Sequence, residues 1–128
     1  MRDYLAALLG KGPFATYMAS EVVMTLVDVG QEISGRDAVE QAIIDFHWVA
    51  FDTRVEIRSL IAGAGTACAE MVFVGKHTGD FVGIPATGRG VRVPYVAVWD
   101  LEGDRITALR LYGPAGGLIQ QLSGDETA

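Results

Sequence analysis

The spacing of apolar residues changes near residue 52, and this change limits the chain to few kinds of fold. From Ala38 to Phe51 apolar residues recur at helical spacing, which is typical of a helix with one buried face. From Arg54 onward they alternate with polar residues, which is typical of half-buried strands. Because neither surface is stable alone, the pattern predicts an α+β fold, with the helix packed in the concavity of a curved antiparallel sheet.

The sequence predicts further elements on both sides of this change. Four strands are expected after it, at Arg54–Ile61, Thr66–Gly75, Val91–Asp100 and Arg105–Tyr112. Before it, β-branched residues predict a strand at Glu21–Val29, and two short helical segments are expected at Arg2–Leu9 and Phe14–Ala19. Either Ser34 or Asp37 is expected to cap the main helix.

Length and charge exclude several classes of protein. A chain of 128 residues that is 50% hydrophobic predicts one globular domain, residues 1–128. The net charge of −6 disfavours nucleic acid as a partner. One cysteine, Cys68, and two histidines leave too few ligands for a zinc site, so no metal is expected. The apolar stretches are too short or too interrupted for a signal peptide or a membrane span, and we therefore expect a soluble, cytoplasmic protein.

One stretch, Gly75–Arg89, resembles a known family. It reads Gly-Lys-His-Thr-Gly-Asp-Phe-Val-Gly-Ile-Pro-Ala-Thr-Gly-Arg and is similar to the signature of SnoaL-like polyketide cyclases, members of the NTF2-like superfamily. Shorter similarities lie in order along the chain, at 19–22, 35–38, 50–52, 103–106 and 118–122. The resemblance implies a cone-shaped barrel, with a curved sheet wrapped around N-terminal helices. It also implies a pocket for a small molecule.

The positions at which relatives carry a catalytic carboxylate hold other residues here. The resemblance places these positions at Leu26, Leu111 and Pro114. Asp28 lies two residues beyond Leu26 and therefore on the same face of the predicted strand. Asp28 is thus the candidate general base, although a solvated residue at a strand end is the simpler interpretation.

Two further residues complete a hypothetical catalytic set. Tyr4 precedes a Leu-Ala-Ala-Leu run, which resembles the first helix of isomerase-like members, and its phenol would donate a hydrogen bond to an enolate oxygen. His77 would shuttle protons. The structural alternatives are that Tyr4 fastens the first helix to the sheet and that His77 bonds to its own loop. The second histidine, His47, is expected to be a hydrogen-bonded residue at the edge of the core.

Three functions are compatible with these residues. The first is a cofactor-free acid–base enzyme, a cyclase or isomerase that acts on a hydrophobic carbonyl compound from polyketide, terpenoid or steroid-like metabolism. The second is a protein that binds such a ligand without converting it, and the third is an epoxide hydrolase-like enzyme. Substrate contacts are predicted for six apolar and aromatic residues, namely Leu26, Leu109, Leu111, Phe73, Tyr95 and Trp99.

The resemblance also implies a homodimer. We expect its interface either on the outer face of the sheet, where Val72, Val96 and Val98 would supply apolar area, or on an exposed pair formed by Ile44 and Trp48.

Overall fold

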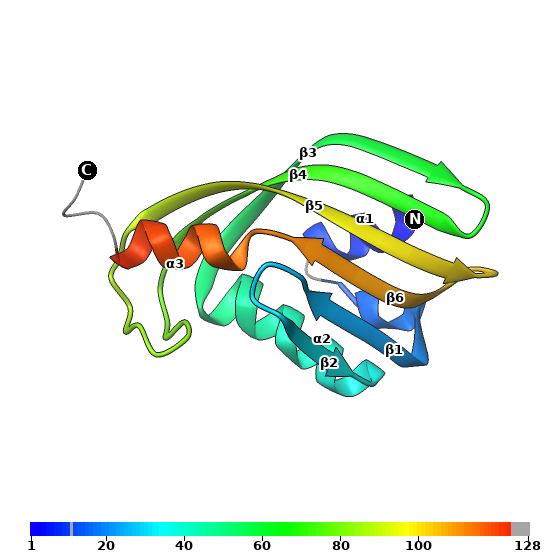
Figure 1. Ribbon diagram of the computed structural model, residues 1–128, viewed down its shortest axis with the longest axis horizontal. Helices are drawn as coiled ribbons and strands as arrows, with labels where there is room; N and C mark the ends of the chain where they lie inside the picture. The colour runs from blue at the N-terminus through cyan, green and yellow to red at the C-terminus, as the bar shows by residue number, and fades with distance from the viewer. Residues whose placement is uncertain (11, 124–128) are drawn as a thin grey trace.

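The computed structural model describes residues 1–10 and 12–123 and has an α+β architecture (Figure 1). Its helical elements are α1 (Arg2–Leu9), the 3-10 turn η1 (Phe14–Tyr17), α2 (Arg36–Ile44), the π-helical turn η2 (Asp45–Val49) and α3 (Ala115–Ser123). Its strands are β1 (Met18–Leu26), β2 (Gln31–Ser34), β3 (Phe51–Gly63), β4 (Thr66–His77), β5 (Gly90–Glu102) and β6 (Arg105–Tyr112).

The six strands form one curved, mixed sheet in the order β2-β1-β6-β5-β4-β3. The sheet does not close, and β2 and β3 are its edges. Strands β3 to β6 pair antiparallel as predicted, whereas β1 pairs in parallel with β6, for example Leu26 with Leu111. The expectation of a purely antiparallel sheet is wrong for this pair, because alternation of side chains reports burial and not strand direction.

The core lies on the concave side of the sheet. Val39 and Ile43 of α2 are buried there with inward-facing residues of β4 and β5, such as Phe73 and Trp99. Packing of the main helix against this face is therefore confirmed. Figure 1 shows α2 beside β1 and β2, and α3 beside the start of β5.

Several boundaries differ from the prediction. The first strand begins at Met18 and ends at Leu26, and the short β2 that follows it is too brief and too exposed to give a periodic signal. Gly35 occupies the N-cap of α2, with a φ of 93°, and no side chain caps the helix, so the assignment to Ser34 or Asp37 is wrong. The predicted helix to Phe51 instead ends its α-helical part at Ile44 and continues as η2.

Within the residues that the structure describes, no helix is long and apolar enough to cross a membrane.

Candidate functional site

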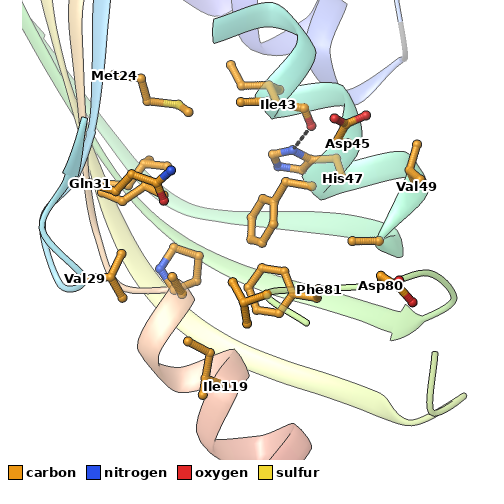
Figure 2. A pocket seen from close by; sticks show the side chains of 18 residues that line it. Met24, Val29, Gln31, Ile43, Asp45, His47, Val49, Asp80, Phe81 and Ile119 are labelled. Atoms are coloured by element: carbon orange, nitrogen blue, oxygen red, sulfur yellow. Dashed lines mark hydrogen bonds between the residues drawn. The ribbon is translucent and has the colours of Figure 1, made fainter. Parts of the chain in front are cut away.

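A cavity of about 750 Å³ opens between the end of α2, η2, the first strands and the start of α3 (Figure 2). Residues of the 78–89 segment close one side of it. Most of its wall is apolar, with the side chains Met24, Leu26, Val29, Ala42, Ile43, Phe46, Val49, Ala50, Phe81, Val82, Leu111, Pro114, Ala115 and Ile119. An apolar cavity of this size is typical of a site for a small organic molecule.

The three positions to which the family resemblance assigns a carboxylate all lie in this wall. Leu26 and Leu111 are neighbours on the paired strands β1 and β6, and Pro114 lies two residues after the end of β6. The alignment of these positions therefore leads to the cavity, but this chain presents hydrocarbon at each of them.

Four polar side chains line the same cavity, namely Gln31, Asp45, His47 and Asp80. Figure 2 shows Gln31 on the opposite side from His47, with both side chains directed toward the space between them. Asp45 accepts a hydrogen bond from the Gln41 side chain at 2.8 Å, and Asp80 is exposed. The polar groups thus surround an otherwise hydrocarbon interior.

His47 has the geometry of a neutral imidazole with a free acceptor. Its Nδ1 lies 2.9 Å from the Ile43 carbonyl oxygen, and because a carbonyl only accepts, Nδ1 carries the hydrogen and Nε2 keeps a lone pair. Burial among protein atoms lowers the pKa of His47, and the bond to Ile43 only partly opposes this shift. Because Nδ1 is already bonded, Nε2 is the nitrogen that remains for a ligand.

The turn η2 is what brings these groups to the cavity. The Ala50 N–H donates to the Asp45 carbonyl at 2.7 Å, which closes a turn wider than that of an α-helix. Of its five residues only Trp48 does not line the main cavity. Helical spacing already puts His47 next to Phe46 and four residues after Ile43, and its bond to the Ile43 carbonyl agrees with the expected hydrogen-bonded residue at the edge of the core.

Asp28 lies outside this cavity. Its side chain is exposed, and its Oδ2 accepts the Gly116 N–H at 2.6 Å, in the first turn of α3. The strand ends at Leu26, so the alternation that put Asp28 on the face of Leu26 does not extend to it. The observed contact is that of an N-terminal helix cap supplied from another part of the chain.

Tyr4 lies in a layer behind the cavity. It is 2% exposed, and its ring meets those of Phe14, Tyr17 and Trp99 edge-on at 6.1–6.4 Å. Burial raises the pKa of its phenol. Tyr4 lines a second, much smaller cavity of about 30 Å³, together with four of the predicted substrate contacts, Leu109, Leu111, Tyr95 and Trp99. Leu111 and His47 line both cavities.

His77 is fully buried and holds the 78–89 segment. Its Nδ1 accepts the Thr87 N–H at 3.2 Å and lies 3.0 Å from the Thr87 hydroxyl, while its ring packs against Phe51. It lines neither of the two cavities described above. The structure therefore does not bring Asp28, His77 and Tyr4 together.

Two remaining expectations concern Phe73 and the pair formed by Ile44 and Trp48. Phe73 reaches the site indirectly, because its ring stacks on Phe46 with a centroid separation of 4.8 Å. The prediction of an exposed pair at Ile44 and Trp48 is wrong, since both are partly buried against the core and Trp48 meets Phe14 edge-on at 5.8 Å.

Among the described residues, no group of three or more His, Cys, Asp or Glu side chains has the arrangement of a metal site.

A curved sheet packed around a helix, with an apolar cavity between them, is the arrangement of the NTF2-like fold, a class of proteins that act on or bind small molecules. The sequence matches the family of SnoaL-like polyketide cyclases over residues 12–122, and the chain belongs to that family. No curated protein matches it.

Solved structures show the same fold at low identity. A protein assigned as a SnoaL-like polyketide cyclase from Jannaschia sp. CCS1 is 17% identical with a TM-score of 0.80, over 95% of this chain and 90% of its own. A protein assigned as a polyketide cyclase from Pseudomonas putida KT2440 is 19% identical with a TM-score of 0.79, over 95% and 94%.

A protein of ketosteroid isomerase-like fold from Catenulispora acidiphila, solved with trimethylamine, is 19% identical with a TM-score of 0.72, over 94% and 88%. The family thus implies a fold of the cyclase or isomerase type, and a fold alone does not determine an activity.

Proposed function

We propose that the main cavity binds a hydrophobic carbonyl compound and that His47 acts on it as a general base, in a cofactor-free reaction of the cyclase or isomerase type. The observation that carries this proposal is the state of His47. A neutral imidazole with a bonded Nδ1–H and an Nε2 acceptor beside an apolar cavity is suited to remove a proton.

The proposed chemistry uses two facing side chains. His47 Nε2 takes a proton from the carbon next to the carbonyl, so the C–H bond breaks and an enolate forms. The amide N–H of Gln31, on the opposite side of the cavity, donates to the enolate oxygen. The imidazolium then returns its proton, either to another carbon in an isomerisation or to the alkoxide formed when the enolate attacks a second carbonyl.

A second candidate function is ligand binding without chemistry. It is favoured by the hydrocarbon at Leu26, Leu111 and Pro114, the positions that relatives use for carboxylates. The hypothesis drawn from the sequence has Asp28 as general base, Tyr4 as hydrogen-bond donor and His77 as proton shuttle. It requires a rearrangement that would bring these three separated groups to one ligand.

Exchange of α-protons in D₂O tests the proposal with a flat bicyclic ketone, 2-tetralone, as probe. The wild-type protein is expected to accelerate deuterium incorporation, followed by NMR. The variant His47→Asn should lower the exchange rate at least ~100-fold while binding of 2-tetralone changes little. Asparagine is chosen because its amide keeps a donor for the Ile43 carbonyl and removes the base.

Control variants distinguish the candidate bases and the two candidate functions. Asp104→Asn, in the turn between β5 and β6, makes a charge change outside the cavity and should leave exchange unaltered. A loss of exchange in Asp28→Asn with none in His47→Asn would return the base to Asp28. Binding of 2-tetralone without any acceleration by the wild type would favour the binding protein.

A further inference from the structure

The charged residues of the main cavity all have the same sign. Two of its lining residues are carboxylates, Asp45 and Asp80, and the part of the chain that the structure describes contributes no lysine or arginine to its wall. His47 adds no compensating charge near neutral pH, because burial lowers its pKa. A ligand that enters therefore meets a negative potential and no cationic partner.

The two carboxylates come from different elements and lie on the same side as His47. Asp45 begins η2, whereas Asp80 belongs to the 78–89 segment, and Figure 2 shows both on the side opposite Gln31, with Val49 between them. Both side chains are exposed, as are the neighbouring valines Val49 and Val82. This arrangement puts the charges where the cavity meets solvent and leaves its depth apolar.

Aromatic rings lie close to the acidic groups. Phe46 follows Asp45 and Phe81 follows Asp80, and their ring centroids are 5.7 Å apart within the cavity wall. The faces of aromatic rings attract cations and not anions. In addition, His47 Nε2 has no hydrogen-bond donor among the described residues and is directed into the same space. Carboxylates, ring faces and a lone pair all favour a positively charged ligand.

From these features we propose that the cavity selects an apolar molecule that carries an amine or other organic cation, whose charged group lies at the mouth near Asp45 and Asp80 while its apolar body occupies the interior. Carboxylates, phosphates and other anions are disfavoured, since they would give up hydration without gaining a cationic partner. The ligand class rests on the proposed function only in that both place the ligand in the same cavity.

The experiment compares three probes with one carbon skeleton, 4-phenylbutylamine, 4-phenylbutan-1-ol and 4-phenylbutyrate. Dissociation constants are measured by calorimetry at pH 7.5, and NMR shift changes at residues 45–49 and 80–82 report the location. We expect the amine to bind about tenfold more tightly than the alcohol, and the acid to bind most weakly. The preference for the amine should shrink as salt concentration rises.

Charge-neutral variants give the matched control. Asp45→Asn and Asp80→Asn should each reduce the preference for the amine severalfold and leave the affinity for the alcohol within about twofold. Asp104→Asn removes the same charge from the turn between β5 and β6 and should not alter the preference. The choice of Asn at position 45 preserves an oxygen for the bond from Gln41.

Two different failures are distinguishable. Equal binding of the alcohol and the amine, or an amine preference that survives both substitutions, overturns the proposed ligand class and leaves the proposed function standing. Absence of binding by all three probes overturns the apolar small-molecule site itself, and the proposed ligand class with it.

Discussion

The two histidines of this chain show how one hydrogen bond decides the role of a residue. His77 Nδ1 accepts from the Thr87 backbone N–H, so its hydrogen sits on Nε2, inside the core and without a partner among the described residues. His47 Nδ1 donates to the Ile43 carbonyl, so its Nε2 remains an acceptor beside the cavity. The same kind of side chain therefore stabilises a segment in one place and presents an acceptor nitrogen to a cavity in the other.

Burial of His47 predicts a pH-dependent contribution to stability. Its pKa is lower in the folded protein than the ordinary 6.5, so the unfolded chain binds more protons below that pH, and stability falls as pH decreases. We expect the free energy of unfolding of His47→Asn to decline less than that of the wild type between about pH 6.5 and 5, as measured by urea denaturation.

Above pH 7 the two curves should run parallel, because His47 is neutral in both states there. The carboxylates are common to both proteins and cancel in the difference. Parallel curves at every pH would contradict the assigned environment of His47.

Among the elements, η2 and the 78–89 segment depend on each other. The N–H groups of Thr78 and Gly79 both donate to the Ala50 carbonyl, at 2.9 and 3.0 Å. A Cβ at Gly79 would lie 2.5 Å from the Val49 carbonyl oxygen, so only glycine permits this approach. Since the segment and η2 form adjoining parts of the cavity wall, this contact fixes their position relative to each other.

The variant Gly79→Ala is therefore expected to separate these two elements. We expect a loss of about 1–3 kcal/mol in the free energy of unfolding, together with faster amide exchange at residues 78–82. Gly63→Ala, at the end of β3, is the matched control because a Cβ there meets nothing within 4 Å and its φ is not in the left-handed region. A Gly79→Ala protein as stable as the Gly63→Ala protein would contradict the close contact.

At the scale of the whole molecule, the outer face of the sheet has an apolar strip and a charged border. Val96 faces Glu70 and Val98 faces Cys68 across β4 and β5, and Val72 faces Pro94. Around them Glu56 pairs with Arg92 at 3.0 Å and Asp100 with Arg110 at 2.7 Å, and these hydrogen bonds lower the pKa of both carboxyl groups. Such a surface is suited to a second copy of the chain.

We predict a homodimer through this strip, observable by sedimentation at micromolar concentration. Val98→Lys should place a charge in the interface and raise the dissociation constant at least ~10-fold. Val27→Lys, at an exposed position in the turn after β1, should leave it unchanged. Equal sedimentation of the wild type and Val98→Lys would contradict a dimer interface on this face.

By itself, the sequence determined the α+β class, because helical and alternating periodicities report burial over many residues at once. The glycine-containing turns at 62–65 and 102–104 also predicted the antiparallel hairpins β3–β4 and β5–β6. It also determined the family, through the Gly75–Arg89 stretch and the ordered shorter matches. Leu26 and Leu111, two positions to which the resemblance assigns a carboxylate, line the cavity.

Only the tertiary structure decided the parallel pairing of β1 with β6, the exposure of Asp28 and the cavity that lies beside His47. Each depends on contacts between distant parts of the chain, which leave no periodic trace in the sequence. Asp28 lies at α3 because a loop after β1 meets a helix 88 residues later, through the Gly116 N–H. The cavity beside His47 exists because η2, the first strands, the 78–89 segment and the start of α3 come together there.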